Sequence, residues 1–487
     1  MSSQSGFPDP TPGSEHRIVD ATGQYVVPPE VLFVHAYMLG LDRRRQGALH
    51  PLPPLEPSEV AAFIAAKAHT AVKTWDPTFR RDLGSFEVAV SRLRPRVAWL
   101  YTHPTTRETG TRFCAVARAS GAMVIAAGPD ALLRPALYLR SGADAVVLGE
   151  GENATLDLVL ALRTSDYRPS AEVLAHIPGL CWMDDHGTLR YSSGSERPVP
   201  IEQLPWPHRD PESTRVHLDR WLAVKQHRQL AVRSARGCPL SCGFCTNTVF
   251  GRPYRRRTPS DVVAELVDLM DRFPVERFVF TDEVFVFDPM WISDFCKEVE
   301  RSGRTLRFGA SAHPATLDDA SIHALARVGL ERIELDAASG SSRLLGRLGW
   351  SYEPSAVYRA ATILRASGIE IGLQVLVGLP GETREDLDST MEMVSIIQPQ
   401  GVEVTRVDPN SPALFRKDWA RVVEGPYADL AKKEGVLPAP VLDAASAWLA
   451  THGENQQQLS VPARVVRAAR GPLLRAAVRA LPGRRRR

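Results

Sequence analysis

Three closely spaced cysteines are the residues of this chain best suited to chemistry. Cys238, Cys242 and Cys245 follow a CxxxCxxC pattern within the ten residues 236–245. Three thiolates on so short a loop can bind three irons of one cubane cluster, which leaves the fourth iron open to a small chelating molecule. A zinc site would require four ligands, and no fourth Cys or His follows within reach. The alternative, three buried or incidental cysteines, does not account for the spacing.

This stretch resembles the cluster-binding motif of the radical S-adenosylmethionine (SAM) superfamily. The resemblance implies a [4Fe–4S] cluster whose open iron binds the amino and carboxylate groups of SAM. An electron from the cluster would cleave SAM to a 5′-deoxyadenosyl radical, which takes a hydrogen from an unactivated carbon. Phe244 stands where an aromatic residue usually lies beside the adenine. The resemblance also implies an electron donor such as flavodoxin or ferredoxin, and it leaves the substrate open.

The composition is that of a soluble globular protein with room for two or three domains. The chain has 487 residues, of which 44% are hydrophobic and 24% charged. No run of apolar residues is long enough to span a membrane, and residues 1–17 lack the apolar region of a signal peptide. We therefore expect a cytoplasmic protein, whose six cysteines lie in a reducing compartment and bind metal rather than form disulfides.

Short apolar strands alternate with helical segments in the first part of the chain. We expect these strands at residues 31–34, 97–101, 123–127 and 145–148. The alternation predicts an α/β fold with a doubly wound, Rossmann- or flavodoxin-like parallel sheet, whose ligands bind beyond the carboxyl ends of the strands.

The same segment resembles the cobalamin-binding domain that precedes many radical SAM domains. The Gly-Glu-Gly-Glu turn, the Gly-Pro after the third strand and two proline-containing linkers carry the resemblance. It implies that cobalamin, through its corrin ring or nucleotide tail, contacts residues at the strand ends, where small residues let a long ligand run close to the backbone. These residues are Thr102, Thr105, Gly128, Gly149, Glu150, Gly151 and Glu152.

The chain departs from the family's pattern at two points. It has no Asp-x-His-x-x-Gly motif to supply a histidine ligand to cobalt, an absence that is usual in the radical SAM branch, and the proline-rich stretch of the family survives only as residues 53–57. A flavodoxin-like domain that binds another ligand, or none, is therefore the alternative. His35 and His103 lie at strand ends, where a histidine is more often hydrogen-bonded than bound to a metal.

From residue 230 the alternation of strands and helices resumes and resembles the partial (βα)₆ barrel of radical SAM enzymes. A parallel barrel gathers its site at the carboxyl ends of its strands. The resemblance assigns cofactor-binding roles at these ends to Asp282, Glu283, Ser339, Gly340 and Gly378. A solvated pair is the alternative for the two acids, and Ala338 replaces the acid of the family's usual Glu-Ser-Gly.

The sequence divides into five segments. They are a flexible leader (1–27), a cobalamin-binding-like domain (28–195), a linker (196–229), the partial barrel (230–415) and a helical, basic tail (416–487). The last 27 residues hold nine arginines and no acid, and such an amphipathic end could contact an anionic membrane or an acidic carrier protein. A frayed tail is the alternative. A specific nucleic-acid role is not expected, because the rest of the chain is not basic.

These resemblances imply a cobalamin-dependent radical SAM C-methyltransferase. In such an enzyme one SAM methylates cobalamin to methylcobalamin, and a second SAM supplies the radical that activates an unactivated carbon of the substrate. The substrate is expected to be a small molecule, such as a secondary-metabolite intermediate. A cyclase, oxidase or rearrangement enzyme with the same cofactors is one alternative. A non-catalytic cobalamin or iron–sulfur sensor is another.

Overall fold

The structure is a computed structural model that describes residues 18–19, 25–26, 28–41, 51–165, 167–240, 254–407 and 435–454. The chain forms two compact units. Unit 1 comprises residues 1–199 and 205–213, and unit 2 comprises residues 200–204 and 214–487. Within the expected leader, the described residues form a short antiparallel pair of strands, β1 (Ile18–Val19) and β2 (Tyr25–Val26).

Unit 1 is built on a seven-stranded sheet with the order β4-β3-β5-β6-β7-β8-β9. The strands are β3 (Val31–His35), β4 (Val72–Trp75), β5 (Val97–Tyr101), β6 (Met123–Ala127), β7 (Ala145–Val147), β8 (Leu180–Met183) and β9 (Leu189–Tyr191). The first five are parallel, and the last two are added antiparallel. The order of the parallel strands places a topological switch point between β3 and β5, where the chain winds in opposite directions.

The helices of unit 1 connect these strands. They are α1 (Glu56–Ala68), α2 (Gly84–Leu93), α3 (Arg107–Ala119), α4 (Pro129–Leu133), α5 (Pro135–Arg140), α6 (Glu152–Arg163) and α7 (Ala171–His176), with the short 3₁₀ helices η1 (Leu39–Leu41) and η2 (Pro104–Thr106). The first four residues of β3 and of β5 are fully buried. Continuous burial of this kind is typical of central parallel strands covered on both faces.

Unit 2 is built on a curled sheet of six parallel strands in sequential order, β10-β13-β14-β15-β16-β17. The strands are β10 (Gln229–Val232), β13 (Arg277–Phe280), β14 (Phe308–Ala312), β15 (Leu330–Asp336), β16 (Glu370–Val377) and β17 (Gly401–Arg406). A two-stranded pair, β11 (Ala235–Arg236) and β12 (Arg255–Arg256), stands apart from this sheet. The α/β architecture with a doubly wound sheet and a partial parallel barrel confirms the predicted fold class.

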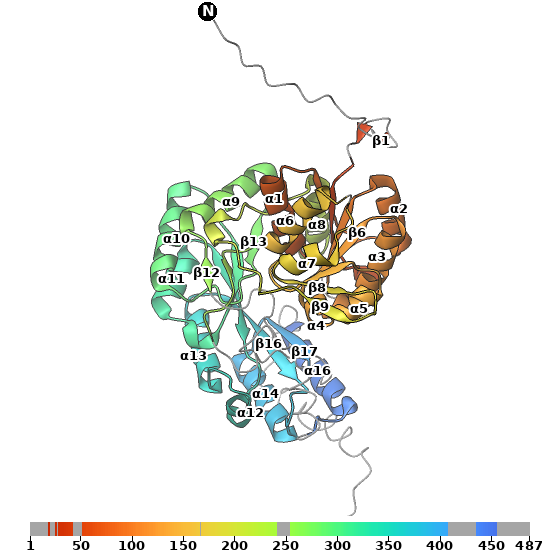
Figure 1. The fold of residues 1–487 in the computed structure, drawn as a ribbon. Helices are drawn as coiled ribbons and strands as arrows, with labels where there is room; N and C mark the ends of the chain where they lie inside the picture. Colours follow the sequence, from red (N-terminus) through yellow and green to blue (C-terminus); the bar gives the residue numbers. More distant parts are fainter. Residues whose placement is uncertain are drawn as a thin grey trace, which may run out of the picture. The chain divides into compact units, whose positions relative to one another are not determined.

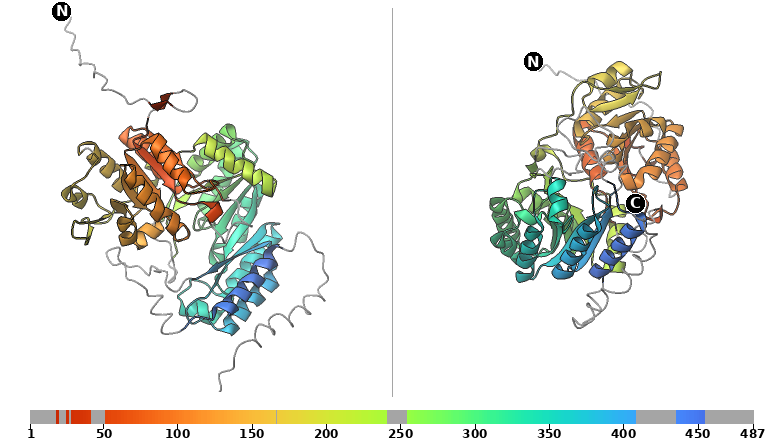
Figure 2. Two further views of the ribbon diagram at one scale, coloured as in Figure 1. Left: turned by 90° about the vertical axis from the view of Figure 1, so that its right-hand side faces the viewer. Right: turned by 90° about the horizontal axis from the view of Figure 1, so that it is seen from below.

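The helices of unit 2 lie between successive strands (Figure 1). They are α9 (Pro259–Arg272), α10 (Pro289–Ser302), α11 (Asp319–Arg327), α12 (Ser342–Arg347), α13 (Pro354–Ala366) and α14 (Arg384–Ile397), with η4 (Pro314–Thr316) after β14. Helix α16 (Ala439–Glu454) packs against β17 and α14 (Figure 2). The expected linker contains η3 (Ile201–Gln203) and α8 (Pro211–Lys225). The last 27 residues, predicted to form a basic, amphipathic end, lie outside the described residues.

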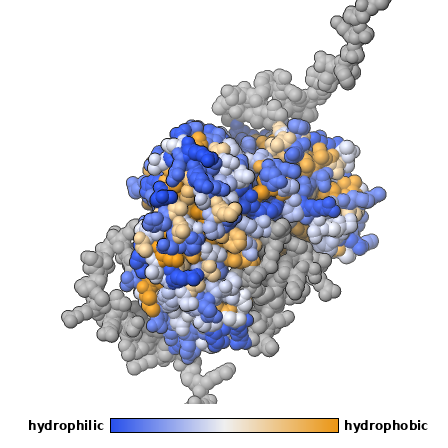
Figure 3. Space-filling model, turned by 90° about the vertical axis from the view of Figure 1, so that its left-hand side faces the viewer, coloured by the Kyte–Doolittle hydropathy of each residue, from blue (hydrophilic) through white to orange (hydrophobic). Residues whose placement is uncertain are grey.

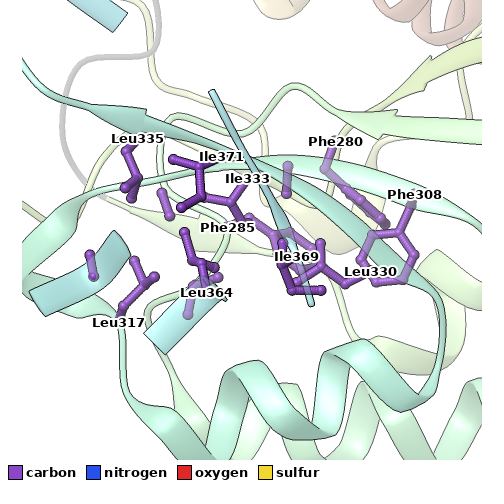
Figure 4. Packing of buried hydrophobic residues seen from close by; sticks show 14 of the residues in the cluster. Phe280, Phe285, Phe308, Leu317, Leu330, Ile333, Leu335, Leu364, Ile369 and Ile371 are labelled. Carbon is purple, nitrogen blue, oxygen red and sulfur yellow. The ribbon is translucent and has the colours of Figure 1, made fainter. Parts of the chain in front are cut away.

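Side-chain caps and apolar faces explain why these helices form. Thr258, Asp288, Asp318 and Thr383 each accept a hydrogen bond from a backbone N–H in the first turn of the helix that follows, which satisfies a donor that the helix itself cannot. The apolar faces of α10, α11 and α13 pack on the sheet around Phe280, Phe308 and other core residues (Figure 4). The side of the molecule that carries α10 and α11 is largely hydrophilic (Figure 3).

Strand β15 carries polar and apolar residues in alternation, which assigns each set to one face. Ile333 and Leu335 belong to the core beneath the helices. Arg332, Glu334 and Asp336 therefore lie on the inner face of the curled sheet. Arg332 Nε lies 2.6 Å from Glu334 Oε1 and forms a salt bridge with it.

Candidate functional site

The segment that carries the cysteine motif is held at both of its ends. Ala235 pairs with Arg256 and Arg236 with Arg255 in the β11–β12 pair, so the chain between these strands leaves and returns at one place. Cys238 lies in this segment and is half-buried, whereas Cys242, Phe244 and Cys245 lie outside the described residues. Among the residues that the structure describes, no group of three His, Cys, Asp or Glu side chains is placed to hold a metal.

Asp282 fastens the strand that leads into this segment. Its carboxylate accepts hydrogen bonds from the Ser234 backbone N–H at 3.0 Å and from the Ser234 hydroxyl at 3.0 Å. Burial raises the pKa of Asp282, and the nearby Arg256 guanidinium opposes that rise. Asp282 was predicted to bind SAM, and in this structure it positions the residue four places before Cys238. Glu283, the neighbouring acid, is exposed.

The arginines that follow the motif lock the other end of the segment. Arg256 stacks its guanidinium 3.4 Å above the Trp291 ring and donates a hydrogen bond to the Phe285 carbonyl. Arg257 is paired with Asp261 and Glu265 on α9. The segment therefore starts and ends on rigid elements, which is the support that a cluster-binding loop requires.

Ser339 and Gly340 attach the end of β15 to helix α14. The Ser339 hydroxyl is fully buried and lies 3.1 Å from the Thr390 hydroxyl, which also accepts a hydrogen bond from the Gly340 N–H at 2.9 Å. A Cβ at Gly340 would lie 2.3 Å from the Ser389 carbonyl oxygen, so only glycine fits. These two residues, predicted to contact SAM, hold the loop on the helix in this structure.

Gly378 begins a tight turn after β16. It adopts a φ of +79°, which favours glycine, and its N–H donates a 2.7 Å hydrogen bond to the Glu382 carboxylate. Burial raises the pKa of Glu382 to about 7. The turn at Gly378, which was predicted to bind a cofactor, is therefore shaped by the carboxylate of Glu382.

Asp336 is an acid on the inner face that no sequence motif singles out. Its carboxylate accepts a hydrogen bond from the Trp350 indole N–H at 3.3 Å, and no Arg or Lys of the described residues forms a salt bridge with it. Burial raises the pKa of Asp336 to about 6, although Trp350 opposes the shift. Part of its surface stays exposed, so this acceptor can reach a ligand at the carboxyl end of β15.

Two further groups lie near Asp336. The Tyr352 hydroxyl accepts a hydrogen bond from the Ala338 N–H at 2.9 Å, and its ring makes an edge-to-face contact with His313. Burial lowers the pKa of His313 to about 4, so this imidazole is neutral at physiological pH. Tyr352 and His313 thus lie beside the backbone of Ala338, where the family has an acid, and neither was assigned a role from the sequence.

At the carboxyl edge of unit 1, Thr102 is a structural residue. It is fully buried, and its hydroxyl donates to the Ala127 carbonyl and accepts from the Ala131 N–H. Gly128 adopts a φ of +93°, and a Cβ there would lie 2.4 Å from the Thr102 carbonyl oxygen. The Thr102 side chain, predicted to line the corrin, is therefore enclosed by protein atoms.

Thr105 lies at the same edge and is exposed. Its hydroxyl is 3.1 Å from His103 Nδ1. His103 is therefore hydrogen-bonded, as expected for a histidine at a strand end.

The turn from Gly149 to Glu152 is occupied by an acid from later in the chain. The Glu196 carboxylate accepts hydrogen bonds from the Gly151 N–H at 2.9 Å and from the Ala154 N–H at 3.0 Å, at the positive end of α6. Burial and the nearby Glu152 raise the pKa of Glu196 to about 7. Glu150 and Glu152 are buried, so in this structure an internal carboxylate occupies the predicted binding turn.

Replacing Gly149 by alanine tests this arrangement. A Cβ at Gly149 would lie 2.4 Å from the Glu196 carboxylate oxygen, so the acid must move and its bonds to α6 weaken. We expect the free energy of unfolding to fall by about 1–3 kcal/mol, measured by chemical denaturation. Gly40→Ala is the control, because no heavy atom lies within 4 Å of its added Cβ. Equal stability of the two variants would contradict the arrangement.

Known proteins share this architecture. The Radical SAM superfamily matches residues 232–394. Anaerobic magnesium-protoporphyrin IX monomethyl ester cyclase of Rubrivivax gelatinosus is 24% identical over 295 residues, which cover 60% of this chain and 49% of that protein. An uncharacterized methyltransferase of Pyrococcus horikoshii is 26% identical over 276 residues, which cover 55% of this chain and 57% of that protein. The chain thus spans about half the length of the curated relatives that it matches.

Two solved structures share the fold across both units. The radical SAM methyltransferase TsrM from Kitasatospora setae, bound to its tryptophan substrate and a SAM analogue, superposes with a TM-score of 0.62 at 20% identity, covering 77% of this chain and 72% of that chain. The cobalamin-dependent SAM radical enzyme OxsB with aqua-cobalamin gives a TM-score of 0.63 at 14% identity, covering 85% of this chain and 58% of that chain. None of the helices in the described residues is both long and apolar enough to cross a lipid bilayer.

Proposed function

We propose that this chain, which belongs to the radical SAM superfamily and has the fold of cobalamin-dependent radical SAM enzymes, methylates an unactivated carbon of a small molecule. Membership of the superfamily confirms the predicted [4Fe–4S] cluster and SAM as cofactors. The observation that carries the proposal is the presence in one chain of the cysteine motif, a curled sheet of six parallel strands and an upstream doubly wound sheet, a combination whose fold is shared with cobalamin-dependent radical SAM enzymes. When bound, these cofactors supply a carbon radical and a transferable methyl group.

In this proposal the residues of this chain hold the cluster-binding segment in place and offer a ligand a hydrogen-bond acceptor. Ser234 and Asp282 hold the segment that carries Cys238, so that a cluster bound there has a fixed position. Asp336 offers a hydrogen-bond acceptor on the inner face of the sheet, where a ligand nitrogen or hydroxyl can donate to it. The apolar core beneath the strands keeps this face rigid.

In this proposal unit 1 binds cobalamin. A large ring can approach its carboxyl edge, where Thr105 and His103 are exposed. TsrM has been solved with cobalamin and a [4Fe–4S] cluster bound, and it shares this topology. A small-molecule substrate, an electron donor such as flavodoxin or ferredoxin and a cytoplasmic location are part of the same proposal.

A second candidate is a ring-forming or oxidising reaction with the same cofactors. It is favoured by the similarity to the magnesium-protoporphyrin IX monomethyl ester cyclase. Both candidates require cleavage of SAM, so they differ in the product and not in the radical step.

An anaerobic assay separates the candidates. Full-length protein with a reconstituted cluster, hydroxocobalamin, a chemical reductant and SAM is incubated with extracts containing candidate small molecules. The proposal predicts a product heavier by about 14 Da, and by about 17 Da when the SAM methyl group carries three deuterium atoms. A product with no label from that methyl group would favour the second candidate. Absence of SAM cleavage would favour a non-catalytic sensor.

A further inference from the structure

A buried tyrosine hydroxyl lies beside the segment that carries the cysteine motif. Tyr254 directly precedes β12, and Cys238 follows β11 by two residues. In this antiparallel pair Arg236 is the register partner of Arg255. The next positions outward on the two chains are Gly237 and Tyr254. Tyr254 therefore lies opposite the residue that immediately precedes Cys238.

The Tyr254 hydroxyl has a proton to donate and no hydrogen-bond partner in the described part of the chain. The Arg256 guanidinium is close enough to act on it electrostatically, but a guanidinium only donates hydrogen bonds, so it cannot accept the hydroxyl proton. Two atoms of this guanidinium, Nε and Nη1, are likewise buried without a partner among the described residues. Buried donors left unpaired are costly, and they indicate that a ligand, a water or an ion is their acceptor.

Both donors are held in place by aromatic contacts. The Tyr254 ring packs edge-to-face on Phe287, with the ring centroids 5.7 Å apart. Arg256 stacks on Trp291 and uses its Nη2 atom to donate to the Phe285 carbonyl. Donors fixed in this way need little rearrangement to meet an acceptor.

Cys238 is one of the groups that act on the Tyr254 phenol. Burial raises the pKa of Tyr254 to about 12, the Arg256 guanidinium opposes that rise, and Cys238 adds to it. The phenol is therefore neutral at physiological pH and keeps the proton that it can donate. The sulfurs of an iron–sulfur cluster accept hydrogen bonds. The two unpartnered donors thus fit a cluster bound at Cys238.

We propose that Tyr254 donates a hydrogen bond to a sulfur of the iron–sulfur cluster and thereby raises the reduction potential of that cluster. The inference rests on the proposed function, because it requires the cysteine motif to hold the cluster. One-electron reduction by an external donor adds a negative charge, part of which lies on the sulfurs. A hydrogen bond to sulfur stabilises this reduced form more than the oxidised form. Tyr254 therefore affects how readily the cluster is reduced, and it takes no part in holding the iron.

A redox titration of the full-length, reconstituted protein tests the proposal. The visible absorbance of the cluster is followed anaerobically against the solution potential in the wild type and in Tyr254→Phe. We expect the equilibrium constant for one-electron reduction to fall about tenfold in the variant, which is a shift of about 59 mV to lower potential, at unchanged cluster content. Tyr358→Phe is the matched control, because it removes the same hydroxyl from α13, another element of unit 2.

The outcomes separate this inference from the proposed function. If the wild type holds a cluster and Tyr254→Phe has the same potential, the inference is wrong and the proposed function stands. A folded Tyr254→Phe protein without a cluster would contradict a role confined to the potential. If the wild type binds no cluster, the proposed function and this inference fail together.

A second variant covers the case in which Tyr254→Phe does not fold, which circular dichroism reports. Phe287→Leu keeps the hydroxyl but removes the ring on which Tyr254 packs. We expect a smaller fall in the reduction potential, because the hydroxyl is held less firmly. An unchanged potential in Phe287→Leu would then count against the hydrogen bond.

Discussion

Cys238→Ala is expected to abolish the visible absorbance of the iron–sulfur cluster and to reduce SAM cleavage to background. A cluster held by three thiolates loses the protein ligand of one of its irons, and no other described Cys or His side chain is grouped with Cys238 to replace it. Because β11 and β12 hold the segment in place, the backbone cannot easily bring a distant ligand to the empty position. Absorbance spectra and anaerobic assays of SAM cleavage on the reconstituted protein measure both effects.

Cys296→Ala is the matched control for this experiment. Cys296 lies on α10 in the core and is 4% exposed, and burial raises the pKa of its thiol to about 11. It therefore remains a neutral thiol, which is a poor metal ligand. The variant should keep its cluster and lose only packing. A cluster that survives in Cys238→Ala would overturn the assignment of the motif.

The central strands of both sheets could be predicted because burial on two faces requires a continuous apolar run. β5 and β6 are short apolar runs, and each is buried over at least its first four residues. β4 is absent from the predicted strands. It is an edge strand with partly exposed residues, so a polar side chain such as Lys73 interrupts any apolar run.

The positions of the site were easier to predict than its contacts. The sequence places Asp282, Ser339 and Gly378 after three strands of the second sheet, and in the structure they follow β13, β15 and β16. It does not state which partner each side chain meets. Glu196 reaches the turn at Gly151 from 45 positions later in the chain, and no local pattern in the sequence reports such a contact.

Asp336 and the pairing of His35 with Tyr101 on β3 and β5 differ in how far the sequence alone indicates them. Arg332, Glu334 and Asp336 alternate with two apolar core residues, and this alternation indicates a polar inner face. The pairing of His35 with Tyr101 needs the strand order. That order depends on long-range contacts, which a single sequence does not contain.

Asp336→Asn is expected to stabilise the protein above pH 6. The pKa of this carboxyl is raised from 3.8 to about 6 by burial, so the native state binds its proton more tightly than the unfolded state between these values. The free energy of unfolding therefore falls as the pH rises through this window. A neutral amide avoids that cost and can still accept from Trp350. We expect a gain of about 1–2 kcal/mol at pH 8 that disappears below pH 4, measured by denaturant unfolding.

Asp386→Asn should have the opposite effect in the same unit. Burial alone would raise the pKa of Asp386, but hydrogen bonds from Arg343, Ser341 and Thr383 lower it to about 2. The charged carboxylate therefore stabilises the native state above pH 4, and its loss should cost about 1–2 kcal/mol at pH 8.

A destabilising acid on an inner strand face is kept when a ligand needs it. Asp336→Asn should accordingly lower SAM cleavage or product formation while it raises stability, whereas Asp386→Asn should lower stability at neutral pH. If Asp336→Asn is both more stable and fully active, the acid has no part in the site and only its burial remains to be explained.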